Sequence, residues 1–116
     1  MLTNIELNYI ISEVQHIALK LFTNSLKNVI LYGSYARGDF DGGSDVDIML
    51  VVDVPATELS RYSNEIYGLA SRLSMETEQC TTVSVALQDM ATYIHYRDYL
   101  PFFRNISAEG VVIYAA

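Results

Sequence analysis

The stretch from residue 33 to residue 47, GSYARGDFDGGSDVD, gathers the side chains of this chain that are best suited to chemistry. Asp45 and Asp47 stand two residues apart, so on a β-strand both carboxylates leave the same face, roughly 6.5 to 7 Å apart along the chain. Two carboxylates so placed repel each other unless a cation lies between them. A hard divalent cation such as Mg²⁺ suits them, because it takes carboxylate oxygens and completes its shell with water and phosphate. The alternative interpretation is an exposed acidic turn that leads into a strand.

The start of the same stretch favours phosphate binding. Gly33 and Ser34 follow an apolar run at residues 28–32, and residues 34–37 are expected to begin a short helix with Ser34 as its cap. Glycine lets a ligand approach the backbone closely, free N–H groups at a helix start attract phosphate, and Arg37 can add a charge-assisted contact. Taken alone, these residues would be interpreted as an ordinary glycine turn with a surface arginine. Together with the carboxylate pair, they predict a site for a metal-bound nucleoside triphosphate.

Strands and helices with short connections must position this stretch. Apolar residues at helical spacing follow Thr3 and Glu6, which is the pattern of a capped amphipathic helix. A second stripe of helical spacing follows Pro55, and short apolar or alternating segments predict strands. We expect strands at residues 28–32, 45–52, 81–87 and 111–114, a helical stripe at 59–73, and one or two short helices within 89–109. This order predicts an α/β (α+β) fold in a single domain of residues 1–116.

Composition limits the classes of function. Of the 116 residues, 51% are hydrophobic and 18% are charged, which is typical of a well-packed domain and argues against disorder. The net charge of −7 argues against a general affinity for nucleic acid and favours a basic partner or metal ions. Cys80, expected to be a small buried hydrophobe, cannot form an internal disulfide, and no apolar run approaches the roughly 20 residues that span a bilayer. We therefore expect a soluble, cytoplasmic protein without a membrane partner.

The stretch resembles the Gly-Ser, ten residues, Asp-x-Asp motif of the polymerase-beta-like nucleotidyltransferase superfamily, and in particular its minimal nucleotidyltransferase branch of small prokaryotic proteins. The Ala-Arg-Gly after Gly-Ser, the order of expected elements and the GVVIY ending agree with that branch. The resemblance implies a mixed sheet of about four strands flanked by helices. It also implies a two-metal Mg²⁺ site on the catalytic residues Asp45 and Asp47. The nucleotide-binding residues assigned to the stretch are Gly33, Ser34, Arg37 and Ser44.

The same resemblance implies a reaction and a partner. Members of this branch move a nucleoside monophosphate, most often AMP from ATP, onto a hydroxyl group. Many act as the antitoxin of a toxin–antitoxin system by modifying a tyrosine on a small helical HEPN-type protein. The acidity of this chain disfavours a nucleic-acid acceptor, so a protein acceptor fits better.

The third expected strand departs from the family pattern. The family usually carries a third carboxylate there, which helps bind the metal that activates the attacking hydroxyl, whereas this chain has Ser84 between two valines. Glu78 and Asp53 have the right strand parity but lie roughly 20 Å away along a strand. Asp39 and Asp41 are the nearest substitutes, although a solvated loop is the favoured interpretation. The alternative function is therefore an impaired nucleotide- and metal-binding module that acts by complex formation, and a purely structural partner is least favoured.

Overall fold

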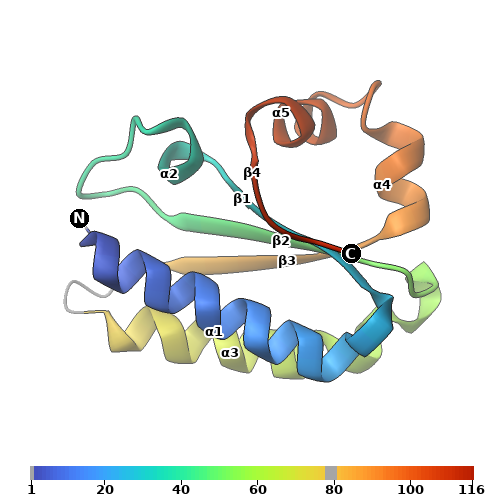
Figure 1. Ribbon diagram of the computed structural model, residues 1–116, viewed down its shortest axis with the longest axis horizontal. Helices are drawn as coiled ribbons and strands as arrows, with labels where there is room; N and C mark the ends of the chain where they lie inside the picture. Colours follow the sequence, from blue (N-terminus) through green and yellow to red (C-terminus); the bar gives the residue numbers. More distant parts are fainter. Residues whose placement is uncertain (1, 78–80) are drawn as a thin grey trace.

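A four-stranded sheet lies between two helical layers in the computed structural model, which describes residues 2–77 and 81–116 (Figure 1). Glu78 and Cys80 lie outside the described residues. In chain order the elements are α1 (Asn4–Phe22), η1 (Thr23–Ser25), β1 (Leu26–Tyr32), α2 (Ser34–Arg37), β2 (Val46–Val52), η2 (Ala56–Tyr62), α3 (Ser63–Glu76), β3 (Val83–Asp89), α4 (Met90–Tyr96), α5 (Pro101–Glu109) and β4 (Val111–Ala115). Every helix and strand expected from the sequence is present.

Local hydrogen bonds set where several elements begin. The predicted capping box of α1 is confirmed, because the Thr3 hydroxyl accepts from the Glu6 N–H at 3.1 Å and the Glu6 carboxylate accepts from the Thr3 N–H at 3.2 Å. β3 begins later than expected, at Val83, whose N–H donates to the Ser74 hydroxyl at 2.8 Å. The expectation that Ser34 caps α2 is wrong. Gly33 occupies the cap position, because the turn there has a φ of 76°, which strains any residue with a side chain.

The strand order β3-β2-β1-β4 makes the sheet mixed, as predicted. β1 pairs antiparallel with both β2 and β4, while β2 pairs parallel with β3. The pairing aligns three residues across neighbouring strands, because Tyr32 is opposite Asp47 and Asp47 is opposite Ser84. The C-terminal end of β1 therefore lies beside the N-terminal end of β2, which in turn lies beside the N-terminal end of β3.

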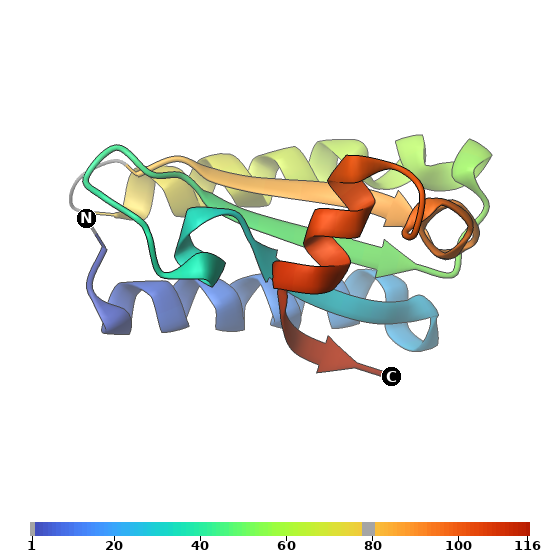
Figure 2. The same ribbon diagram turned by 90° about the horizontal axis from the view of Figure 1, so that it is seen from above.

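Helices cover both faces of the sheet (Figures 1 and 2). Ile48 and Leu50 of β2 belong to the core cluster under α1 and α3, whereas Met49 and Val51 join residues of α4 and α5 on the other face. A strand buried on both faces needs a continuous apolar sequence, and β2 has one. Of its seven residues, only Asp47 is not buried. None of the helices in the described part of the chain has the length and apolarity that crossing a bilayer requires.

A glycine-to-alanine substitution should have opposite effects on stability at Gly110, which is closely packed, and at Gly68, which is open. At Gly110, between α5 and β4, an added Cβ would lie 2.5 Å from the Ile106 carbonyl oxygen and 2.6 Å from Cγ2 of Ile30. We expect Gly110→Ala to lower the free energy of unfolding by about 1–3 kcal/mol, because α5 must shift. At Gly68, in α3, an added Cβ meets nothing within 4 Å. Gly68→Ala should therefore raise the free energy of unfolding by about 0.5–1 kcal/mol, because alanine favours a helix more than glycine does. Urea unfolding followed by circular dichroism measures both, and a stabilised Gly110→Ala would contradict the packing of α5.

Candidate functional site

The turn after β1 places the Gly-Ser dipeptide against the acidic start of β2. A Cβ built on Gly33 would lie 2.5 Å from Oδ2 of Asp47, so the carboxylate lies directly against the glycine backbone. Two features require glycine at residue 33: this close approach and the positive φ of 76°. The structure thus brings Gly33 and Asp47, two of the residues singled out in the sequence, into one corner of the sheet.

Tyr35 anchors the short helix that carries Ser34 and Arg37. Its side chain is buried, its hydroxyl accepts from the Leu2 N–H at 3.3 Å, and its ring stacks on Phe40 with the centroids 4.5 Å apart. These contacts tie α2 to the N-terminus and to the loop that returns to β2. They also hold in place the other residues of this short helix, which begins at Ser34 and ends at Arg37.

The loop between α2 and β2 is held by its own polar residues. The Asp41 N–H donates to the Ser44 hydroxyl at 2.9 Å, and the Gly43 N–H donates to Oδ1 of Asp41 at 2.8 Å. Asp39 accepts from Nε of Arg37 at 3.1 Å. The two loop aspartates are exposed and make local contacts, as a solvated loop would. Ser44 serves the loop here, and its contact with a nucleotide stays a prediction.

Electrostatic repulsion and burial both act on the carboxylate pair. Asp45, just before β2, is exposed, whereas Asp47 is half-buried. Burial, and secondarily the charge of Asp45, raises the pKa of Asp47 above its ordinary value, against a smaller opposing effect of Arg37. Within the described residues, no cluster of three or more His, Cys, Asp or Glu side chains can hold a metal ion. The pair fits Mg²⁺ only together with other oxygen ligands, such as water and phosphate.

Ser84 occupies the position beside Asp47 on the neighbouring parallel strand. It is exposed, and the bond from the Val83 N–H to the Ser74 hydroxyl fixes the start of its strand. Parallel neighbours in register direct their side chains to the same face, so a carboxylate at residue 84 would stand next to Asp47. Asp53 lies beyond the opposite end of β2, and Glu78 lies outside the described residues. The position beside Asp47 on β3 could therefore hold the third carboxylate that the motif resemblance implies, and this chain has a serine there.

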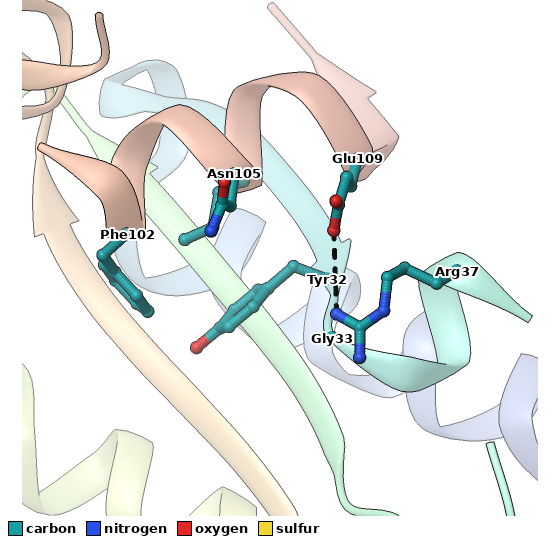
Figure 3. Close-up of a pocket in the computed structure, with 7 residues that line it drawn as sticks. Tyr32, Gly33, Arg37, Phe102, Asn105 and Glu109 are labelled. Atoms are coloured by element: carbon teal, nitrogen blue, oxygen red, sulfur yellow. Dashed lines mark ion pairs between the residues drawn. The ribbon is translucent and has the colours of Figure 1, made fainter. Parts of the chain in front are cut away.

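Helix α5 adds residues that the sequence analysis missed. A cavity of about 190 Å³ lies between α5 and the turn after β1, and Nη1 of Arg37 is 3.7 Å from Oε2 of Glu109 (Figure 3). The cavity is lined by Tyr32, Gly33, Arg37, Phe102, Asn105, Ile106 and Glu109. No local pattern links α5 to the Gly-Ser turn, because the two are far apart in the chain. The one sequence feature that pointed to a role of α5 was the surplus of Tyr and Phe within residues 89–109.

Residues 11–107 of this chain match a family model described as a nucleotidyltransferase domain.

Two proteins of Methanocaldococcus jannaschii are related in sequence to this chain. The candidate protein adenylyltransferase MJ0604 is 31% identical over 108 residues, which cover 84% of this chain and 95% of that protein. A second candidate protein adenylyltransferase, MJ0141, is 38% identical over 71 residues, or 61% of this chain and 70% of that protein.

Solved structures share the fold at lower sequence identity. A crystal structure of a candidate nucleotidyltransferase from Sulfolobus solfataricus has a TM-score of 0.53 and 18% identity, and covers 95% of this chain and 83% of its own. A chain of a toxin–antitoxin crystal structure with AMP-PNP has a TM-score of 0.54 and 17% identity. The match covers 90% of this chain and 73% of that chain. At these identities the likeness concerns the fold alone.

We expect Asp47→Asn to raise the melting temperature of the metal-free protein at neutral pH. The raised pKa of Asp47 means that its ionised form is less favourable in the folded than in the unfolded chain, and a neutral amide removes that cost. Thermal melting in EDTA measures the effect. Asp53→Asn, which changes an exposed aspartate remote from the site, is the matched control and should leave the melting temperature unchanged. A lower melting temperature for Asp47→Asn alone would show that the Asp47 carboxylate is a structural group.

Proposed function

Because this chain belongs to the nucleotidyltransferase domain family, we propose that it transfers AMP from ATP to a hydroxyl group in a Mg²⁺-dependent reaction. The observation that carries the proposal is the contact of the Asp47 carboxylate with the Gly33 backbone. This contact supports the proposal because a carboxylate that could bind a metal lies beside backbone suited to phosphate, which is what a metal-bound triphosphate requires.

Each residue of the site has a distinct part in this proposal. Asp45 and Asp47 would hold the metal, since Asp47 is destabilised as long as its charge is not compensated. Bound Mg²⁺ neutralises phosphate charge and activates a hydroxyl. Gly33 and Ser34 give the phosphates close access to the backbone, and Arg37 adds a guanidinium contact to phosphate oxygens. The two-ion site that the resemblance implies needs at least one further oxygen ligand, because residue 84 is a serine.

The reaction is a displacement at the α-phosphorus of the nucleotide. The acceptor oxygen loses its proton to solvent and forms a bond to phosphorus, while the bond from phosphorus to the bridging oxygen breaks and pyrophosphate leaves. The protein contributes position and charge rather than covalent chemistry. Ser84 lies beside Asp47 on the neighbouring strand, so in this proposal it would lie near the acceptor hydroxyl.

A protein is the favoured acceptor. The relative MJ0604, which matches over most of both chains, is described as a candidate protein adenylyltransferase. The toxin–antitoxin structure of the same fold supports a toxin as the partner and acceptor, with this chain as the antitoxin. That this toxin is of the HEPN type follows from the resemblance of the motif to the minimal nucleotidyltransferase branch. The net charge of −7 disfavours nucleic acid in that place.

The second candidate function is a binding module without turnover. Ser84 favours it, because a neutral hydroxyl stands where the family has a carboxylate and the two loop aspartates are engaged elsewhere. Such a protein would bind nucleotide and metal and would neutralise or sense its partner by complex formation.

Mg·ATP should raise the melting temperature of the protein. A ligand that binds only the native state adds RT ln(1 + [L]/Kd) to stability, about 2.7 kcal/mol at a hundredfold excess over Kd. The measurement is thermal melting with Mg²⁺ and each of the four nucleoside triphosphates, and Asp45→Asn should abolish the shift. If no triphosphate changes the melting temperature, only the structural-partner interpretation survives.

Ser84→Asp should increase AMP transfer by tenfold or more if the missing carboxylate limits it, since about 1.36 kcal/mol of barrier corresponds to tenfold in rate. The measurement is label transfer from α-³²P-ATP to a co-purified partner protein. Ser71→Asp, which adds the same charge on an exposed site of α3, is the control.

The two candidate functions predict different results in this assay. Robust transfer by the native chain, lost in Asp45→Asn and unchanged in Ser84→Asp, would establish a transferase that needs no third carboxylate in the chain. No transfer by the native chain together with a gain in Ser84→Asp would identify the binding module.

A further inference from the structure

The cavity beside α5 opens onto the residues expected to hold phosphate. Gly33 and Arg37 belong to its lining, and residues of α5 form the facing side (Figure 3). A nucleotide anchored through its phosphates at Gly33 and Ser34 has its nucleoside end within reach of this space. The chemistry of the lining therefore indicates which part of a nucleotide the cavity suits.

Most of the lining is uncharged, and part of it is aromatic. The rings of Tyr32 and Phe102 meet edge to face, with centroids 5.9 Å apart and planes at 89°. Ile106 is buried in the cluster beneath them, whereas Phe102 remains 53% exposed. An exposed ring at the edge of a cavity offers a stacking surface, and every nucleobase presents a flat face that stacks on such a ring.

Asn105 adds the one uncharged amide of this lining. Its side chain extends from α5 toward Tyr32 (Figure 3). Asn105 is exposed, so its amide is accessible to a ligand. An amide offers a donor and an acceptor in one plane, which matches the paired donor and acceptor on the edge of adenine.

The charged residues gather at one end of the cavity. Arg37 pairs there with Glu109 at 3.7 Å and also with Asp39 at 3.1 Å, so a phosphate has to compete with these two acids for the guanidinium. The other residues that line the cavity carry no charge that would attract a phosphate deeper into it. An uncharged, planar group suits the remaining space better than an anion does.

We propose that this cavity binds the base of the nucleoside triphosphate, adenine where ATP is the substrate, stacked on Phe102 and hydrogen-bonded by Asn105. The proposal rests on the proposed function, because that function brings a nucleotide to Gly33. It adds α5 to the site as the element that recognises the nucleoside.

The test compares two ligands that differ in the nucleoside. Calorimetric titration of the full chain with Mg·ATP and with Mg·tripolyphosphate separates binding of the base from binding of the phosphates. We expect native protein to bind ATP about tenfold more tightly than tripolyphosphate. Phe102→Ala and Asn105→Ala should each remove most of this difference and leave tripolyphosphate binding within about twofold. Tyr67→Ala and Asn64→Ala, on exposed sites of α3, are matched controls that should change neither ligand's affinity.

The outcomes separate this inference from the proposed function. Equal affinity of the native protein for both ligands, unaffected by the α5 variants, would overturn the base site while leaving the proposed triphosphate site in place. Equal losses for both ligands in the α5 variants, with unchanged melting temperatures, would show that the cavity binds phosphate and would also overturn the base site. Binding of neither ligand by native protein would overturn the proposed function and the base site together.

Discussion

The close approach of the Asp47 carboxylate to the Gly33 backbone is the contact on which the rest of the site depends. Three features of the fold produce it: antiparallel pairing puts Tyr32 opposite Asp47, a positive φ at Gly33 turns the chain sharply, and the absent side chain leaves room for the oxygen. The rest of β2 is buried on both faces, so the strand cannot slide to relieve the contact. The rigid core therefore holds the carboxylate in place.

This arrangement has an energetic cost that a ligand would relieve. The pKa of Asp47 is raised by burial and by Asp45, and the pKa of Tyr32 is raised by burial and by the charge of Asp47. Unfavourable charge at a site is common where proteins bind ions, because the bound ion supplies the compensation. Arg37 meanwhile pairs with an acid from its own loop and with one from α5. A phosphate bound at the proposed site would compete for this arginine, which would couple that site to α5.

Family membership and chemistry are separate questions in this protein. The nucleotidyltransferase domain accounts for the fold and for the position of the Gly-Ser turn, but a fold can host an altered site. Ser84 is the residue where the distinction matters. It is exposed and lies beside Asp47 on the neighbouring strand, but it carries no charge. If the proposed transfer takes place, a further acid beside Asp47 would have to come from a loop or a partner, because residue 84 is a neutral serine.

The sequence by itself determined the elements and the motif, because their signals are local. The capping box at Thr3 and Glu6 and the spacing of Asp45 and Asp47 depend on neighbours only a few residues away. Only the tertiary structure decided that Gly33, rather than Ser34, caps α2, that Ser84 stands beside Asp47, and that α5 forms a cavity over the turn. These features depend on strand register and on packing between segments distant in the chain, and no local pattern of residues encodes such a contact.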